Sequence, residues 1–219
     1  MCIRDRNNLA DHNARPEKAF RLILASTSPY RAQLLGRLQL QFEQLSPDCD
    51  ETALPAESPE ALVRRLSEIK ARSVLDELVG KSATSAATPL VVIGSDQVAD
   101  CNGKVLGKPH TVERAHEQLS LMSGQDVVFR TGLCVATSGK SAITVDVVNV
   151  TARFRELGRD EIERYVSAEK PLDCAGSFRS EALGIALLSA LEGDDPNALI
   201  GLPLIQLAKR LRALGMQVP

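Results

Sequence analysis

One short apolar run constrains the fold more than any other stretch of this 219-residue chain. Residues 90–93 read Leu-Val-Val-Ile, a run that is too short for a helix and typical of a buried strand. The run breaks at Gly94, and the polar segment 95–97 (Ser-Asp-Gln) follows it. We therefore expect a buried strand with Asp96 at its end, where ligands bind in α/β sheets. A carboxylate there can hold a divalent cation or act as a general base on water.

The rest of the chain mixes predicted strands with predicted helices. Residues 20–26 (FRLILAS) read as a buried strand, and Ser28 and Pro29 then have the residue types favoured at a helix start. Apolar side chains at helical spacing predict a long helix over about 59–78, with Lys70 beside the apolar stripe. Because helices do not follow every strand, we expect an α/β fold with a mixed, twisted sheet flanked by helices.

Turn and capping residues predict the remaining elements. Asn102-Gly103, between two short apolar runs, predicts a β-hairpin. Loops are expected at 80–89 and 170–184. The other expected elements are a strand at 42–47, a helix at 111–122, strands at about 127–136 and 142–154, a helix at 158–169, a strand from about 185 and a last helix from near Pro203.

Composition excludes several classes of protein. The net charge is −2 and the Lys and Arg residues are dispersed, which argues against binding to a nucleic-acid polymer. No apolar run approaches the length of a membrane span. The five cysteines and three histidines lack paired metal or disulfide spacings. We therefore expect a protein of the reducing cytoplasm with no membrane partner.

The first residues differ from the rest of the chain. Residues 1–19 are polar, have no clear periodicity and lack the apolar core of a signal peptide. We expect them to form a poorly ordered leader, and residues 20–219 to form a single domain.

Several separate motifs, in order, resemble the Maf family, also called the septum-formation family. They are LILASTSPYR, DCDET, IKARS, GSDQV, GKP, DCAGSFRSEALG and EGDDPNALIGLPL. The resemblance covers about residues 21–214 and implies two lobes around a central cleft, as in ITPase-like folds. It also implies cleavage of a nucleoside triphosphate to a monophosphate and pyrophosphate with a divalent cation, Mg²⁺ or Mn²⁺, and a homodimer.

The resemblance also implies roles for individual residues. Asp96 matches the proton acceptor that activates water, and with Glu51 it would hold the metal. The implied catalytic residues are Glu51, Lys70, Asp96 and Lys108. Ser26 and Arg31 match the phosphate-binding turn after the first strand, where a helix start can bind an anion. The cations in this set suit a triphosphate, because they can offset its negative charge and that of the transition state.

Three departures from the common family pattern resemble one branch, the 7-methyl-GTP pyrophosphatases. Tyr30 stands where others have a second Arg, Gln97 lies in GSDQ where many have GADT, and Glu181 lies in a loop where others carry a Gln. Methylation at N7 gives guanine a delocalised positive charge, on which Tyr30 can stack with a cation–π contribution. Glu181 can accept from the N1–H and N2–H groups of guanine, and uracil or thymine would leave this carboxylate unpaired.

Two alternatives stay open at this point. The first is a dTTP or UTP pyrophosphatase with the same chemistry, which a panel of nucleotides distinguishes. The second is a nucleotide-binding regulator of cell division whose hydrolysis is incidental. The variant Asp96→Asn tests the second, because a regulator should keep its cellular effect without the water-activating carboxylate.

Overall fold

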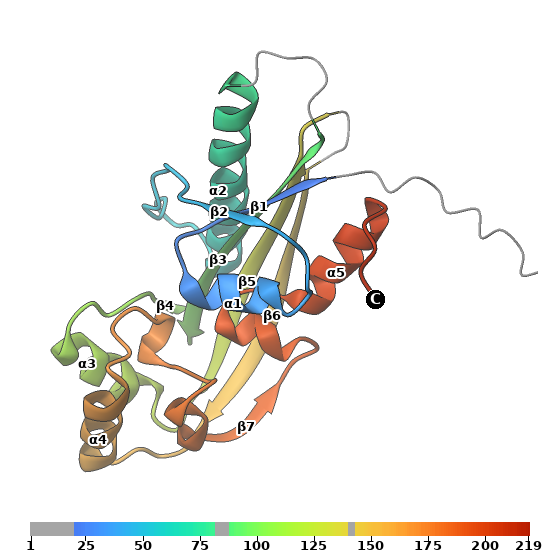
Figure 1. Ribbon diagram of the computed structural model, residues 1–219. Helices are drawn as coiled ribbons and strands as arrows, with labels where there is room; N and C mark the ends of the chain where they lie inside the picture. Colours follow the sequence, from blue (N-terminus) through green and yellow to red (C-terminus); the bar gives the residue numbers. More distant parts are fainter. Residues whose placement is uncertain (1–19, 82–87, 140–142) are drawn as a thin grey trace, which may run out of the picture.

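The computed structural model describes residues 20–81, 88–139 and 143–219, so the predicted leader lies outside the described residues (Figure 1). The strands in this part are β1 (Arg21–Ala25), β2 (Glu43–Leu45), β3 (Leu90–Cys101), β4 (Lys104–Leu106), β5 (Asp126–Thr137), β6 (Thr144–Phe154) and β7 (Leu188–Glu192). The α-helices are α1 (Pro29–Gly36), α2 (Pro59–Lys81), α3 (Val112–Met122), α4 (Arg159–Glu169) and α5 (Leu204–Ala213). Three short 3-10 helices are η1 (Ala175–Ser177), η2 (Leu183–Leu187) and η3 (Pro196–Ile200).

The strands form one mixed sheet, which confirms the predicted fold class. Its order is β2-β1-β3-β5-β6-β7, and β4 pairs with β3 off this path. β1 is parallel to β2 and β3, whereas the pairs from β3 through β7 are antiparallel. None of the helices in the described ranges is both long and apolar enough to cross a membrane.

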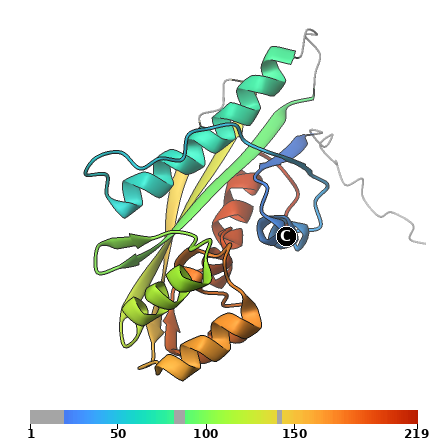
Figure 2. The ribbon, with the colours of Figure 1, turned by 90° about the vertical axis from the view of Figure 1, so that its left-hand side faces the viewer.

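The helices cover the two faces of the sheet unequally. Figure 2 shows α2 on one side of the long strands and α1 and α5 on the other. Alternation along β3 matches this arrangement, because Val92 packs with α2 while Ile93 packs with α1 and α5. Further along the strand, on the same face as Ile93, Ala99 packs with α3 and α4. β3 therefore runs through both parts of the molecule.

β3 does not end at Gly94, so the predicted placement of Asp96 at a strand end is wrong. The strand continues to Cys101, and what changes along it is its partner on one edge. β1 pairs with residues 90–94 of β3, and β4 pairs with residues 99–101. Among the described strands, none pairs with this edge over residues 95–98. Asp96 therefore lies in mid-strand, at an open stretch of edge.

Gly94 does not end the strand; its missing side chain allows α2 to approach β3 closely. A Cβ on Gly94 would lie 2.1 Å from the backbone oxygen of Ser67 in α2. A Cβ on Gly132, the cross-strand partner of Asp96, would lie 2.2 Å from another backbone oxygen of α2. An isolated glycine in a strand often marks such an approach. The backbone of α2 rests directly on the sheet here, which brings Lys70 to Asp96.

Most other predicted elements are confirmed within a few residues. Asn102 and Gly103 both have positive φ, 52° and 84°, as a two-residue hairpin turn of type I′ requires. α2 extends to Lys81, so the start of the predicted loop at 80–89 is helical, and residues 82–87 lie outside the described part. The strand predicted from about 185 starts only at Leu188, because η2 precedes it.

Candidate active site

A cavity of about 660 Å³ opens beside the unpaired edge of β3. Its size lies within the range of roughly 300–1,000 Å³ that is usual for small-molecule sites. Every residue that the sequence assigned to the site lines it: Ser26, Tyr30, Arg31, Glu51, Lys70, Asp96, Gln97, Lys108 and Glu181. Six separate segments of the chain contribute these side chains, so the fold brings the candidates together.

Lys70 lies between two carboxylates of this cavity. Its Nζ donates to Oδ1 of Asp96 at 2.7 Å and lies 2.8 Å from Oε2 of Glu51. Lys70 and Asp96 are 5% and 7% exposed, whereas the side chain of Glu51 is 57% exposed. We call these three residues the carboxylate–lysine cluster. Two of its members, Lys70 and Asp96, are buried against the sheet, whereas Glu51 is accessible to solvent.

The loop that carries Glu51 is tied to α2 by Arg65. Nε and Nη2 of Arg65 donate to the two carboxylate oxygens of Glu57 at 2.6 and 2.7 Å. Nη2 also donates to the backbone oxygen of Thr52 at 3.1 Å. The hydrogen bonds from Arg65 lower the pKa of Glu57 to about 2. This two-pronged contact holds the residue next to Glu51 and so limits where Glu51 can lie.

The turn after β1 forms a corner suited to phosphate. Oγ of Ser28 caps α1 by accepting from the backbone N–H of Arg31 at 3.4 Å. Oγ of Ser26 accepts from the N–H of Ser28 at 3.1 Å and from Nη1 of Arg31 at 3.4 Å. Nε of Arg31 donates to the backbone oxygen of Gly201 at 2.9 Å. Burial lowers the pKa of the Arg31 guanidinium, and the carboxylates of the cluster partly offset this effect. Arginine is nevertheless not deprotonated in proteins, so it can bind an anion here.

Gln97 points to the opposite face of the sheet from Asp96, because successive strand residues alternate. Its Nε2 lies within hydrogen-bond distance of three acceptors: Oγ1 of Thr131 at 3.0 Å and the backbone oxygens of Ala198 and Leu199 at 2.7 and 3.1 Å. These contacts fix the amide against η3. Any contact of Gln97 with a base would therefore use its Oε1.

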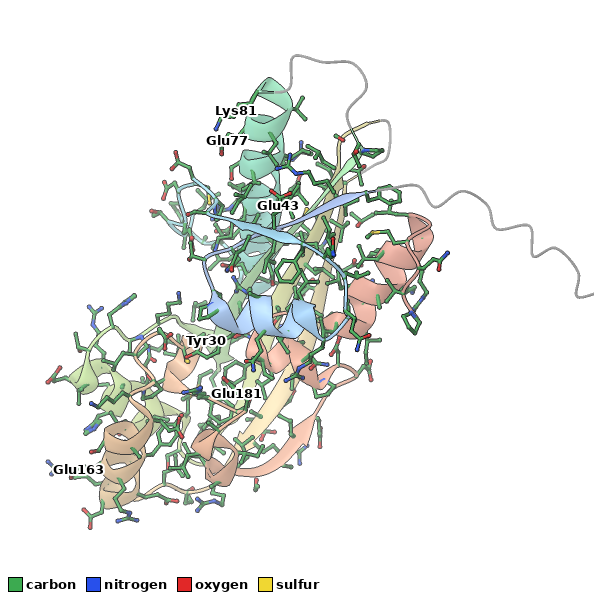
Figure 3. The ribbon with its side chains drawn as sticks, in the orientation of Figure 1. Tyr30, Glu43, Glu77, Lys81, Glu163 and Glu181 are labelled. Carbon is green, nitrogen blue, oxygen red and sulfur yellow. The ribbon has the colours of Figure 1, made fainter. Side chains whose placement is uncertain are left out.

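Tyr30 and Glu181 line the same cavity from α1 and from the loop before η2, and we call them the aromatic–acid pair. Figure 3 shows the two side chains near one another although their segments are far apart in the sequence. Burial raises the pKa of the Tyr30 phenol, so its ring is uncharged at neutral pH.

The structure adds Arg179, which the sequence analysis missed. Its guanidinium carbon lies 5.3 Å from the centre of the Tyr30 ring, and its Nε donates to Oε1 of Glu181 at 3.2 Å. The sequence carried no signal for Arg179, because it lies in a loop just before a turn and its partners come close only in the folded chain.

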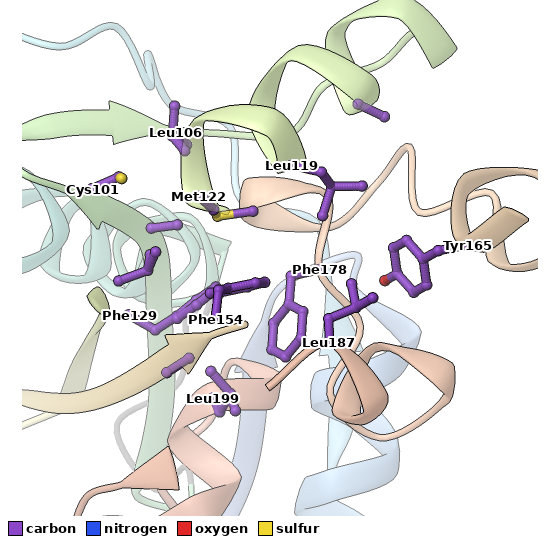
Figure 4. Packing of buried hydrophobic residues seen from close by; sticks show 14 of the residues in the cluster. Cys101, Leu106, Leu119, Met122, Phe129, Phe154, Tyr165, Phe178, Leu187 and Leu199 are labelled. Carbon is purple, nitrogen blue, oxygen red and sulfur yellow. The ribbon is translucent and has the colours of Figure 1, made fainter. Parts of the chain in front are cut away.

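Phe178 anchors the loop that carries Arg179 and Glu181 (Figure 4). Its ring is 5% exposed and its centroid lies 5.5 Å from that of Phe129 and 5.1 Å from that of Phe154. The backbone N–H of Arg179 donates to the hydroxyl of Tyr165 at 3.0 Å. The loop is thus held by an aromatic core contact and one buried hydroxyl.

Lys108 reaches the cavity from the segment after β4. The backbone oxygen of Gly107 accepts from the N–H of Gly176 at 3.1 Å, and the N–H of His110 donates to the oxygen of Leu172 at 3.1 Å. These bonds attach both sides of Lys108 to the loop after α4, while its own side chain stays exposed.

Comparison with known proteins identifies the family. A family model described as "Maf-like protein" matches residues 21–214. The chain belongs to the Maf family. A relative from Nitrosococcus oceani is 52% identical over 199 residues, which cover 90% of this chain and 94% of the relative. Relatives from Pseudomonas aeruginosa and Vibrio cholerae are 50% and 49% identical over 90% and 91% of this chain, and 98% of each relative is covered. All three are named 7-methyl-GTP pyrophosphatase.

In this Maf protein, Glu51 and Asp96 have the chemistry to hold a divalent cation. Each directs one oxygen to Nζ of Lys70, so both carboxylates already face one positive charge. No three His, Cys, Asp or Glu side chains gather as a metal cage within the described ranges. Mg²⁺ commonly takes one or two protein carboxylates and completes its shell with water and substrate phosphates. The two carboxylates therefore fit such an ion.

Proposed function

We propose that this Maf protein hydrolyses 7-methyl-GTP to 7-methyl-GMP and pyrophosphate. The observation that carries the proposal is one cavity lined both by the carboxylate–lysine cluster and by the aromatic–acid pair. The first provides groups for phosphate chemistry, and the second provides groups for a positively charged base. The names of the relatives, which are about half identical over nearly their whole length, support the same substrate.

The cluster carries the chemical step. Asp96 accepts a proton from a water molecule, whose oxygen attacks the α-phosphorus. The bond from the α-phosphorus to the oxygen that bridges to the β-phosphate breaks, and its electron pair leaves with pyrophosphate. Lys70, Arg31 and Lys108 offset the negative charge of the phosphates, which is the main contribution a protein makes to phosphoryl transfer.

A divalent cation, Mg²⁺ or Mn²⁺, completes the proposal. Glu51 and Asp96 are the residues that would hold it, as the convergence of their oxygens on Lys70 supports. When bound, such an ion would polarise phosphate oxygens and neutralise part of their charge. Chelation should abolish turnover, and the bound ion should also be detectable by calorimetry with the Mn²⁺ ion alone.

The aromatic–acid pair carries the selectivity. Tyr30 stacks on the base and gains a cation–π contribution from the methylated ring, which carries a positive charge. Glu181 accepts from two adjacent N–H groups of guanine. A pyrimidine such as uracil lacks both features, so the Glu181 carboxylate would keep its contact with Arg179 but gain no pair of N–H donors from the base. Oε1 of Gln97 is a further acceptor at the same cavity, with the amide nitrogen held by η3.

A panel of nucleotides tests the proposal. Purified protein with Mg²⁺ or Mn²⁺ would be incubated with 7-methyl-GTP, GTP, dTTP, UTP, CTP and ATP, and monophosphate and pyrophosphate would be quantified. We expect kcat/KM to be highest for 7-methyl-GTP. Preference for dTTP or UTP would keep the chemistry and overturn the base assignment. Absence of hydrolysis with every nucleotide would favour a nucleotide-binding regulator instead.

Assembly and location are proposals that rest on the family resemblance. We expect a homodimer, which light scattering of the purified protein would test. We also expect a cytoplasmic protein, for which cell fractionation is the test. The cysteines that the structure describes, Cys49, Cys101, Cys134 and Cys174, are all free thiols, which suits a reducing compartment.

A further inference from the structure

We propose that Arg179 is a positioning residue for base selection, which holds Tyr30 and Glu181 in the relative orientation that a 7-methylated guanine requires. The inference rests on the proposed function. Arg179 is absent from the residues that line the cavity, whereas Tyr30 and Glu181 both line it. Arg179 therefore acts through these two side chains.

One guanidinium joins two distant segments. Its carbon lies 5.3 Å from the centre of the Tyr30 ring, and its Nε donates to Oε1 of Glu181 at 3.2 Å. Tyr30 lies on α1 and Glu181 on the loop before η2, as the labelled side chains of Figure 3 show. One base can stack on Tyr30 and bind Glu181 only if these two side chains keep a fixed relative orientation. Arg179 contacts both of them.

Arg179 is itself held from a third direction. Its Nη1 lies 3.5 Å from Oε2 of Glu169, at the end of α4. Oε1 of Glu169 accepts from the backbone N–H of Leu183 at 3.0 Å, so this carboxylate is fixed to the start of η2. The side chain of Glu169 is 16% exposed and that of Arg179 is 34% exposed. The guanidinium therefore has a defined place rather than a free surface position.

The charges of this group suit a cationic base. Glu169 and Glu181 are negative and Arg179 is positive, and Asp173, which lines the cavity and acts on Tyr30, adds a further carboxylate, so these four leave a net negative charge near the Tyr30 ring. A 7-methylated guanine brings one positive charge to that point, while unmodified guanine brings none. A planar guanidinium can contact a ring and two carboxylates at once, which a lysine ammonium, as a single point charge, does less well.

The test compares Arg179→Ala with wild type for 7-methyl-GTP and GTP. Loss of Arg179 should release Tyr30 and Glu181, so that kcat/KM for 7-methyl-GTP falls about tenfold through KM, while GTP changes about twofold or less. Arg179→Lys should recover part of the preference. Glu169→Gln, which removes only the outer anchor, should give a smaller loss in the same direction.

Arg155→Ala is the matched control. Arg155 also binds this region, because its Nε donates to the backbone oxygen of Ala186 at 3.0 Å and its Nη2 contacts Glu161. It has no contact with Tyr30 or Glu181, so this variant should keep the preference for 7-methyl-GTP even if its melting temperature falls. If Arg155→Ala lowers the preference as much as Arg179→Ala, the effect is general loosening and the inference is wrong.

The outcomes separate this inference from the proposed function. If wild type shows no preference for 7-methyl-GTP, the proposed function fails and the inference fails with it. If wild type shows the preference and Arg179→Ala keeps or increases it in a folded protein, only the inference fails. An increase would mean that Arg179 merely neutralises Glu181. A loss that Arg179→Lys partly restores, with kcat little changed, would support positioning.

Discussion

The carboxylate–lysine cluster and the aromatic–acid pair share one cavity but are built in different ways. Lys70 and Asp96 lie on α2 and β3, two regular elements in direct backbone contact, and both are buried. Tyr30 and Glu181 lie at a helix start and on a loop, and Arg179 joins them through partly exposed contacts. Lys70 and Asp96 are positioned by secondary structure, whereas Glu51 and the aromatic–acid pair are positioned by loops and side-chain contacts.

This difference separates chemistry from selectivity. A rigid scaffold suits the step that all nucleoside triphosphates share, whereas loops tolerate change and commonly carry binding specificity. Substitutions in the cluster should therefore affect every nucleotide alike. Substitutions in the aromatic–acid pair should change the ratio between nucleotides. Each of the following experiments tests whether chemistry and selectivity are divided in this way.

The largest effect is expected from Asp96→Asn. The amide cannot accept the proton of the attacking water, so kcat should fall about 10²–10⁴-fold for every nucleotide, the usual contribution of a general base. Single-turnover rates of product formation from 7-methyl-GTP and GTP would measure the loss, with the melting temperature as a check on folding. A loss confined to 7-methyl-GTP would contradict the division, because it would place Asp96 in base selection.

Gly94→Ala should disturb the scaffold of the cluster. The added Cβ would lie 2.1 Å from the backbone oxygen of Ser67, so α2 must move away from β3. We expect a loss of about 1–3 kcal/mol in the free energy of unfolding, as in overpacked cores. The displacement of Lys70 should lower kcat by up to about a hundredfold for all nucleotides. Denaturant unfolding and kinetics of the same preparation would measure both.

Gly80→Ala, on the helix α2 that packs against Gly94, is the control. A Cβ on Gly80 has no heavy atom within 4 Å, so nothing needs to shift. Alanine there should leave the kinetics unchanged and raise the free energy of unfolding by up to about 1 kcal/mol, the usual gain over glycine in a helix. Equal destabilisation by both variants would mean that close packing at Gly94 is not what holds α2.

Glu181→Gln should alter selectivity with little change in the chemistry. A neutral amide loses the attraction to the methylated base and one of two acceptor oxygens, so kcat/KM for 7-methyl-GTP should fall about 10–100-fold. The loss for GTP should be much smaller. Competition kinetics with both nucleotides would give the ratio directly. Glu163→Gln, an exposed position on α4 labelled in Figure 3, is the control. Equal losses for both nucleotides would remove Glu181 from base selection.

Much of the fold could be predicted from local sequence signals. The N-cap Ser28 and Pro29, the Asn102-Gly103 turn and the helical spacing of α2 are written in short stretches, and each produced the expected element. The end of β3 could not be predicted in this way, because a glycine that breaks an apolar run and a glycine that admits a helix look alike. What distinguishes them is the position of α2, which is tertiary information.

The candidate site shows the same limit. Motifs placed the cluster and the pair in the sequence, and the structure brings them into one cavity. Arg179 and Arg65 escaped notice because each acts by contacts with residues from another segment. Charged residues of this kind are usually solvated surface groups, so sequence offers no reason to single them out. Their partners appear only when the chain is folded.

The smallest effect is expected where a partly buried contact outside the cavity supports the cluster. Glu57→Gln weakens the contact with Arg65 that holds the loop of Glu51, so kcat/KM should fall only about twofold for every nucleotide, the low end of what one hydrogen bond contributes. The folded pKa of Glu57 is lowered from 4.5 to about 2, so its contribution to stability is present above about pH 4.5 and is lost as the pH falls toward 2. The difference in melting temperature between wild type and Glu57→Gln should therefore shrink on acidification.

Glu77→Gln is the control: it breaks the pair with Lys81 far along α2 and should leave kcat/KM unchanged. A change in the ratio of 7-methyl-GTP to GTP in Glu57→Gln would show that the loop of Glu51 also contributes to selectivity, and that the two parts of the cavity are not independent.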